Sequence, residues 1–136
     1  MFEESVHSEC SAREYVETIS HRRRPIHNIA SDNPSLRAKG CRQAVNTIIQ
    51  GSAADIIKLS MVAVDKAIRR RALDASLLLQ MHDELMYEVV DAAERPLEFA
   101  QLLKTQMEKV SRHLKVILPV KVRIGPNWGQ LSDLSL

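Results

Sequence analysis

The chain is poor in cysteine and has no long apolar run, and each scarcity excludes a class of protein. Cys10 and Cys41 are the two cysteines among 136 residues. They lie far apart without metal-ligand companions, so we expect free thiols and a reducing compartment. No stretch approaches the roughly 20 apolar residues of a membrane span. The first thirty residues lack a secretory hydrophobic run. These features predict a soluble, intracellular protein that has no membrane partner.

The composition is that of a globular protein, with 45% apolar and 26% charged residues, enough for one compact domain or part of one. The net charge of +2 does not indicate nucleic acid by itself. However, the segment from Arg13 to Arg42 holds seven basic residues against three acidic ones. Such a cluster can neutralise phosphates, although a solvated arginine-rich loop has the same composition.

The first half of the chain is expected to be helical, with turns that divide it. Residues 1–20 are weakly patterned, and residues 14–19 are expected to continue a helix that begins earlier. Pro25 disfavours helical geometry at the residue before it, so residues 22–25 should form a loop or an extended segment. Residues 31–34 are a turn suited to capping a helix over about 35–49, loosened or interrupted near Gly40.

A second helix is expected after Gly51, with Ser52 as its N-cap and its end near residues 71–73. One apolar stripe at spacings of three and four defines it: Ala54, Ile57, Met61, Val64 and Ile68.

A β-hairpin is predicted next, from two apolar runs at residues 76–81 and 85–90. They should form largely buried strands joined by an acidic tip that carries neither glycine nor asparagine.

The last third predicts a helix and a strand. An amphipathic helix should start near Pro96 along the stripe Phe99, Leu103, Met107, Val110 and Leu114. A strand follows over residues 116–124, and a turn over 125–129. The order of elements predicts an α+β fold, with helices packed on one antiparallel sheet and no internal domain boundary.

The acidic tip of the hairpin is a candidate metal site. Asp83 and Glu84 are adjacent, and strand alternation sends them to opposite faces, so they cannot bind one ion together. A single carboxylate still suits Mg²⁺, which keeps several waters and binds substrate phosphates. His82 could donate a hydrogen bond to a phosphate or a sugar. A solvated acidic turn without function explains the same three residues.

A second candidate site lies on the helix that precedes Gly51. Arg42, Asn46 and Gln50 are spaced by four and therefore share one helix face. Their guanidinium and amide groups could contact the minor-groove acceptors of nucleic acid, which are nearly the same for every base pair. A polar face exposed to solvent is the alternative.

Four segments of the chain, within about residues 13–130, resemble segments of family-A DNA polymerases. They follow one another in the same order as in that family. Residues 42–58 resemble the conserved helix pair, and Gln80-Met81-His82-Asp83-Glu84-Leu85 resembles motif C. Residues 22–25 resemble the basic loop before the helix pair, and residues 124–129 resemble the terminal glycine–tryptophan turn. The sequence of residues 46–50 is more similar to the nuclear theta and nu branch of the family than to bacterial polymerase I. This similarity implies a nuclear location.

The resemblance implies a palm domain that transfers a dNTP to a primer 3′-hydroxyl on template DNA with two Mg²⁺ ions. Asp83 is then a metal ligand and catalytic carboxylate, Glu84 supports the primer end or the outer shell of the metal, and His82 contacts the primer terminus. It implies minor-groove contacts for Arg42, Asn46, Gln50 and Gln80. It implies phosphate contacts for Arg23 and Arg24.

The sequence also departs from the family pattern. No segment among these residues resembles motif A, with its second metal aspartate, or the fingers helix, so we expect these to be supplied by upstream polymerase segments. His21 stands where the family usually has glycine. We therefore expect the chain alone not to polymerise DNA. A palm-derived module that binds DNA or a partner without catalysis is the first alternative. An unrelated metal-dependent hydrolase using Asp83 and Glu84 is the second.

Overall fold

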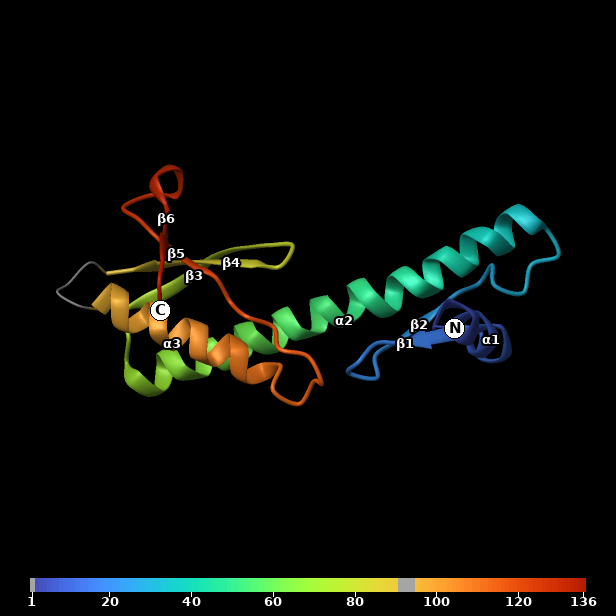
Figure 1. Cartoon of the computed structure of the whole chain (residues 1–136), viewed down its shortest axis with the longest axis horizontal. Helices are drawn as coiled ribbons and strands as arrows, with labels where there is room; N and C mark the ends of the chain where they lie inside the picture. The colour runs from blue at the N-terminus through green and yellow to red at the C-terminus, as the bar shows by residue number, and fades with distance from the viewer. Residues whose placement is uncertain (1, 91–94) are drawn as a thin grey trace. The chain divides into compact units, whose positions relative to one another are not determined.

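The computed structural model describes residues 2–90 and 95–136, and its contacts group into two compact units (Figure 1). One unit runs to Asp55 and the other begins at Ile56, where the sequence analysis expects no internal boundary. The first unit contains α1 (Phe2–Arg13), β1 (Tyr15–Glu17), β2 (Arg23–Pro25) and the start of α2 (Pro34–Arg71). The second contains the rest of α2, β3 (Ala75–Met81), β4 (Glu84–Val89), α3 (Arg95–Val110), β5 (Val122–Ile124), the 3₁₀ turn η1 (Trp128–Gln130) and β6 (Ser132–Leu134).

The α+β class is confirmed, but the expected single sheet is not. The described residues form three two-stranded antiparallel sheets, β1–β2, β3–β4 and β5–β6. Each pair joins strands that are neighbours in the sequence, so local pairing accounts for all three.

In the first unit, α1 ends where the sequence analysis expects it to continue. Glu14 has a φ of 60°, the left-handed conformation that commonly terminates a helix, and its amide donates to the carbonyl of Cys10 at 2.7 Å. Residues after Glu14 therefore enter β1, and the prediction of helix over residues 14–19 is wrong. The expectation of extended chain at residues 22–25 is confirmed, because β2 pairs there with β1.

The core of the first unit combines α1, the β1–β2 hairpin and α2. Its buried members are Val6, Cys10, Val16, Ile26, Ile29 and Ala44. Cys10 is fully buried and Cys41 packs partly buried against the same cluster; both are free thiols, as expected. Burial raises the pKa of the Cys10 thiol, and Cys41 adds to the shift. Cys10 therefore packs as a small apolar residue.

Helix α2 begins as the turn at residues 31–34 predicts. The side-chain oxygen of Asn33 accepts hydrogen bonds from the amides of Ser35 at 2.9 Å and Leu36 at 3.4 Å, which caps the first turn. The helix then continues through Gly40 and Gly51 to Arg71, so the expected interruptions are wrong.

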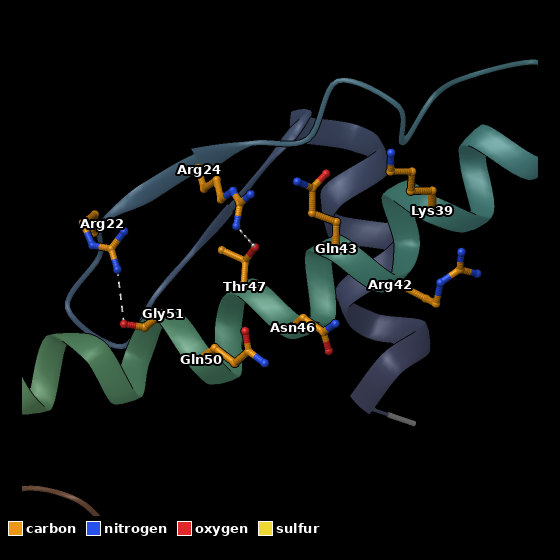
Figure 2. Close-up of a pocket in the computed structure, with 9 residues that line it drawn as sticks. All are labelled: Arg22, Arg24, Lys39, Arg42, Gln43, Asn46, Thr47, Gln50 and Gly51. Carbon is orange, nitrogen blue, oxygen red and sulfur yellow. Dashed lines mark hydrogen bonds between the residues drawn. The ribbon is translucent and has the colours of Figure 1, made fainter. Parts of the chain in front are cut away.

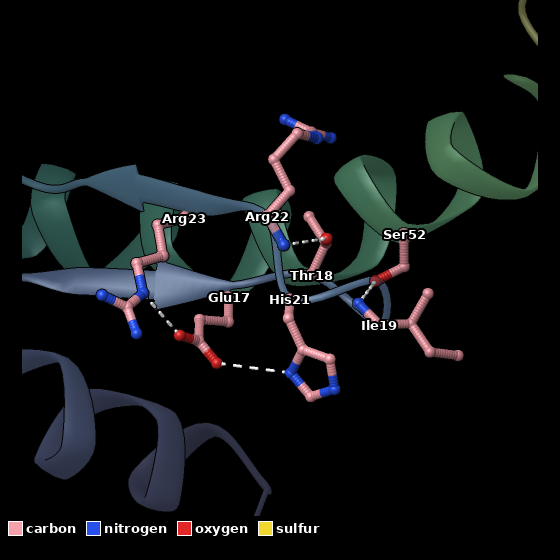
Figure 3. Close-up of polar contacts among 7 residues, drawn as sticks. All are labelled: Glu17, Thr18, Ile19, His21, Arg22, Arg23 and Ser52. Carbon is pink, nitrogen blue, oxygen red and sulfur yellow. Dashed lines mark hydrogen bonds and ion pairs between the residues drawn. The ribbon is translucent and has the colours of Figure 1, made fainter.

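Tertiary contacts explain both apparent break points in α2. A Cβ at Gly40 would lie 2.9 Å from the carbonyl carbon of Asn28 and 2.9 Å from the amide nitrogen of Ile29, so the glycine admits a neighbouring backbone. Ser52 does not cap a helix. Its hydroxyl accepts the amide hydrogen of Ile19 at 2.9 Å and holds the β1–β2 turn (Figure 3).

By length and composition, α2 also passes the test for a membrane span, with a window of mean hydropathy 1.3. The sequence was expected to hold no such stretch, and by this criterion that expectation is wrong. A core helix of a soluble protein passes the same test. Val64 and Ala67 of α2 are buried in the core of the second unit, so part of this apolar surface packs within the protein.

In the second unit, Val64 and Ile68 of the predicted apolar stripe of α2 pack in one cluster with residues of α3 and the β3–β4 hairpin. Val64, Ala67, Phe99 and Leu102 form the buried cluster. The ring of Tyr87 meets that of Phe99 edge-on, with centroids 5.4 Å apart. Burial raises the pKa of Tyr87 to about 12, and the Asp65 carboxylate adds to the shift. The stripe from Pro96 also forms a helix as predicted, although α3 ends at Val110.

The β3–β4 hairpin is confirmed, but its tip is shorter than expected. Met81 pairs with Glu84, so His82 and Asp83 form a two-residue turn and Glu84 belongs to β4. His82 has a φ of 52°, a conformation that hairpin turns usually assign to glycine or asparagine. The expectation of largely buried strands is wrong, because every residue of β3 after Ala75 is exposed.

The strand expected over residues 116–124 shortens to β5. Val116 and Ile117 are 62% and 91% exposed, and pairing begins only at Val122. The turn after it returns the chain into β6, which the sequence analysis did not predict. Gly125 makes this return possible, because a Cβ there would collide with the carbonyl oxygen of Gln130.

His21 occupies a left-handed position in the β1–β2 turn, with a φ of 59° (Figure 3). This geometry explains why glycine suits the position, since left-handed backbone costs other residues about 1–2 kcal/mol. We expect His21→Gly to stabilise the chain by about 0.5–1 kcal/mol, because glycine also loses more entropy on folding. Urea unfolding monitored by circular dichroism measures the change.

The matched control is His27→Gly, since His27 is also exposed but its φ is not positive. This change is expected to destabilise the chain by about 0.5–1 kcal/mol. Equal destabilisation by both changes would contradict backbone strain at His21.

Candidate nucleic-acid interface and metal site

Three consecutive arginines lie in the β1–β2 hairpin, and their side chains alternate in direction, so that two of them reach α2. Arg22 donates from Nε to Oδ1 of Asp55 at 2.9 Å and from Nη2 to the carbonyl of Gly51 at 3.2 Å. Arg24 donates from Nη1 to the hydroxyl of Thr47 at 3.0 Å (Figure 2). Side chains two residues apart on an extended segment share a side, so both reach α2.

Arg23 makes its contacts with β1 instead. Its Nε donates to Oε1 of Glu17 at 2.8 Å (Figure 3). Its guanidinium also lies 4.8 Å from the centre of the Tyr15 ring. The hydrogen bond from Arg23 is the main cause that lowers the pKa of the Glu17 carboxyl, and His21 at 3.5 Å adds to it. The stabilisation from this lowered pKa is present above the unfolded-state pKa and is lost as pH falls through the folded value.

A pocket of about 400 Å³ lies between this hairpin and the first part of α2 (Figure 2). Its lining contains four cationic side chains, four uncharged polar side chains and one glycine, and no acidic residue: Arg22, Arg24, Lys39, Arg42, Gln43, Asn46, Thr47, Gln50 and Gly51. Four residues predicted to contact DNA meet here, namely Arg24, Arg42, Asn46 and Gln50. The pocket is therefore an electropositive surface rich in hydrogen-bonding groups.

Four lining residues were not predicted as site residues from the sequence: Arg22, Lys39, Gln43 and Thr47. A signal for three of them is present in the sequence. Lys39, Gln43 and Thr47 recur at intervals of four and so form a second stripe beside that of Arg42, Asn46 and Gln50. Arg22 could have been found from strand alternation, which places it on the same side as Arg24 and opposite Arg23.

The remaining predicted site residues lie in the second unit, at the β3–β4 turn. The side-chain amide of Gln80 donates from Nε2 to the backbone carbonyl of His82 at 3.2 Å. Glu84 accepts from Nη2 of Arg123 at 3.1 Å. Asp83 is exposed, and no contact within the described part of the chain engages its carboxylate.

This turn fits one ligand of a magnesium site. Asp83 offers an exposed, unpaired carboxylate of the hard-oxygen kind that Mg²⁺ prefers. Among residues 2–90 and 95–136, no cluster of three or more His, Cys, Asp or Glu side chains could hold a metal ion. Further ligands would have to come from bound phosphates, water or other protein segments.

Comparisons with known proteins agree on one family. The family model for DNA polymerase family A matches residues 1–130. DNA polymerase I of Chloroflexus aurantiacus is 41% identical over 122 residues, which cover 90% of this chain and 13% of that protein. DNA polymerase theta of Drosophila melanogaster is also 41% identical, over 129 residues that cover 90% of this chain and 6% of that protein. The equal identities do not separate the nuclear branch from the bacterial one.

A solved structure, the POL domain of Pol1 from M. smegmatis in complex with DNA primer-template and dNTP, matches with a TM-score of 0.76 at 38% identity. The match covers 80% of this chain and 19% of that one, so the chain spans a small part of the relatives that it resembles. The family match over residues 1–130 also excludes the alternative of an unrelated metal-dependent hydrolase. The chain belongs to DNA polymerase family A.

Proposed function

We propose that this chain is the C-terminal palm portion of a DNA polymerase and takes part in the template-directed transfer of a dNTP to a primer 3′-hydroxyl. The pocket on α2 carries the proposal. It gathers Arg24, Arg42, Asn46 and Gln50 on one surface with no acidic residue in its lining. A related polymerase domain was solved with primer-template DNA and dNTP, the partners proposed for this chain.

The chemistry of the pocket favours contact with duplex DNA regardless of its sequence. Minor-groove acceptors are nearly the same for all base pairs, so donors such as Arg42, Asn46 and Gln50 report pairing geometry rather than base identity. Arg24 and Lys39 supply positive charge for backbone phosphates, which positions the duplex without reading it. Arg23 is bound by Glu17, so its proposed phosphate contact requires release from that ion pair.

At the hairpin turn, Asp83 supplies one carboxylate to a magnesium site. The bound metal would stabilise the charge that develops on the transferred phosphoryl group. His82 is proposed to contact the primer terminus, and Gln80, on the strand before it, the minor groove of the primer-template duplex. Glu84 is proposed to support this site from beside Asp83.

The second candidate function is DNA binding without catalysis. It is favoured by one contrast within the described residues. The cationic pocket holds several hydrogen-bond donors, whereas the hairpin turn has no group of three or more side chains that could hold a metal ion.

Primer-template binding and primer extension by the purified 136-residue chain test both proposals. We expect salt-sensitive binding to duplex DNA. Arg42→Ala combined with Gln50→Ala should weaken it about tenfold or more, since each lost hydrogen bond is worth about 0.5–1.5 kcal/mol. The matched control is Arg112→Ala with Gln101→Ala, which removes the same groups from exposed positions in the second unit. Equal loss in both double variants would contradict a DNA-binding role for the pocket.

The same chain is expected not to extend a primer with magnesium and dNTPs, because one carboxylate does not assemble a two-metal site. A chimera in which these residues replace the matching segment of Chloroflexus aurantiacus DNA polymerase I should extend it. Robust magnesium-dependent synthesis by the isolated chain would overturn the first expectation. An inactive but folded, DNA-binding chimera would favour the non-catalytic candidate.

A further inference from the structure

Arg22, just before β2, joins the β1–β2 hairpin to two successive turns of α2. Its Nε donates to Oδ1 of Asp55 at 2.9 Å. Its Nη2 donates to the backbone carbonyl of Gly51 at 3.2 Å (Figure 2). The side chain of Asp55 is 10% exposed, whereas that of Arg22 is 52% exposed. The guanidinium therefore bridges the hairpin to a mostly buried carboxylate of the helix.

The hydrogen bonds from the hairpin follow one row of residues on α2. Thr47, Gly51 and Asp55 lie four residues apart, so they share one side of the helix. Arg24 donates to the first of them, and Arg22 donates to the other two. These contacts set the position of β2 along α2. They therefore also set where the Arg24 guanidinium lies in the cationic pocket.

We propose that Arg22 and Asp55 are a positioning pair for DNA binding, which holds the hairpin on α2 so that Arg24 faces a backbone phosphate. Arg22 itself does not contact the DNA. This proposal rests on the proposed function, because it assumes that Arg24 contacts DNA. Although Arg22 lines the pocket, the protein engages its Nε and Nη2 donors. The carboxylate beside it also cancels much of the field of its charge.

Replacement of Asp55 by asparagine separates positioning from direct contact by the sign of its effect on DNA affinity. The change adds one net positive charge and frees Arg22, so a direct phosphate contact of Arg22 predicts tighter binding. Positioning predicts weaker binding, because a loosened hairpin no longer holds Arg24 against the phosphate. We expect affinity to fall about two- to tenfold, the range for one hydrogen bond.

The salt dependence of binding distinguishes positioning from a merely structural role. Each phosphate contact contributes about one to the slope of log affinity against log salt concentration. Loss of the Arg24 contact in Asp55→Asn should therefore reduce this slope by about one. A variant that is only less often folded binds more weakly with the same slope, since every folded molecule keeps its contacts.

The experiment measures binding of a labelled primer-template duplex by the purified 136-residue chain at several salt concentrations, with circular dichroism as the check of folding. We expect Arg22→Gln and Asp55→Asn each to weaken binding, and their combination to weaken it by less than the sum. Arg24→Gln should weaken the parent and have little further effect in either variant. If Asp55→Asn does not fold, the combined variant replaces it, because no buried charge is left unpaired there.

Two controls come from the same unit. Asp32→Asn removes an exposed carboxylate and adds the same net charge, and it should leave binding unchanged or tighter. Ser52→Ala removes another hydrogen bond between the hairpin and α2, the one from Ile19, and should leave the salt slope unchanged. An equal loss of slope in Ser52→Ala would assign the effect to the hairpin as a whole and overturn the specific role of the pair.

Arg24→Gln separates this proposal from the proposed function. If Arg24→Gln weakens binding but Asp55→Asn leaves it unchanged or tighter, the positioning role is overturned and the DNA contact of Arg24 stands. If Arg24→Gln changes neither the affinity nor the salt slope, the proposed contact of Arg24 fails, and the positioning role fails with it. Weaker binding and a lower slope in Asp55→Asn, without further loss from Arg24→Gln, support the pair.

Discussion

Replacement of Asp83 by alanine in the active chimera is expected to reduce primer extension by about a thousandfold or more. A metal ion that stabilises a transferring phosphoryl group is worth several kcal/mol, and each 1.36 kcal/mol corresponds to about a factor of ten in rate. Asp83 is exposed and makes no contact within the described chain, so its loss should not disturb the fold. Single-turnover extension of a labelled primer measures the effect.

DNA binding by the Asp83→Ala chimera should remain within about twofold of the parent. Asp83 does not line the cationic pocket, and contacts with phosphates dominate the affinity for DNA. Asp74→Ala is a matched control, since it removes an exposed aspartate from the same unit. Near-normal synthesis after Asp83→Ala would show that the hairpin carboxylate is not a metal ligand. A parallel loss of DNA binding would show that the change acts through folding.

Part of the candidate site could be predicted because helical periodicity is a local property. Arg42, Asn46 and Gln50 follow one another at intervals of four, and any α-helix places them on one face. Their meeting with Arg24 in one pocket depends on the hairpin lying against α2 through Arg22 and Asp55, which no spacing reveals.

The placement of Arg23 illustrates the limit of motif reading. The resemblance implies phosphate contacts for Arg23 and Arg24 alike, but the short strand β2 gives these two residues opposite sides. Arg23 then finds Glu17 at 2.8 Å on the paired strand. This partner follows from the register of β1 with β2, which places Glu17 opposite Arg23. Strand alternation alone separates Arg23 from Arg22 and Arg24, but a prediction of register would have been needed to identify Glu17 as its partner.

The fold shows the same division between local and non-local causes. The stripe through Ile57 and Val64 predicted the second part of α2, and the run near Phe99 predicted α3. The short strand β6 was missed because three residues carry too little pattern. The prediction of a helix break at Gly51 was wrong. The hydroxyl of Ser52 accepts a hydrogen bond from the backbone amide of Ile19 and does not cap a new helix.

The continuity of α2 through Gly40 leads to the largest expected effect on stability. In an ordinary helix interior, Gly→Ala stabilises by about 0.5–1 kcal/mol. At Gly40, however, the added methyl would lie 2.9 Å from backbone atoms of Asn28 and Ile29, and backbone cannot move aside as a flexible side chain can. Overpacking of this kind costs about 1–3 kcal/mol, so we expect Gly40→Ala to destabilise the first unit by about 1–2 kcal/mol net.

Gly51→Ala is the matched control, because a methyl there would meet the side-chain methyl of Thr18 at 2.8 Å, which can shift more easily than backbone. We expect it to be nearly neutral. Hydrogen exchange of peptides from residues 2–50 measures the first unit, and the fluorescence of Trp128, the one tryptophan, reports the second. Gly40→Ala should accelerate exchange in the first unit and leave the Trp128 transition close to that of the parent. Slower exchange would mean that helix propensity, rather than contact with residues 28–29, governs this position.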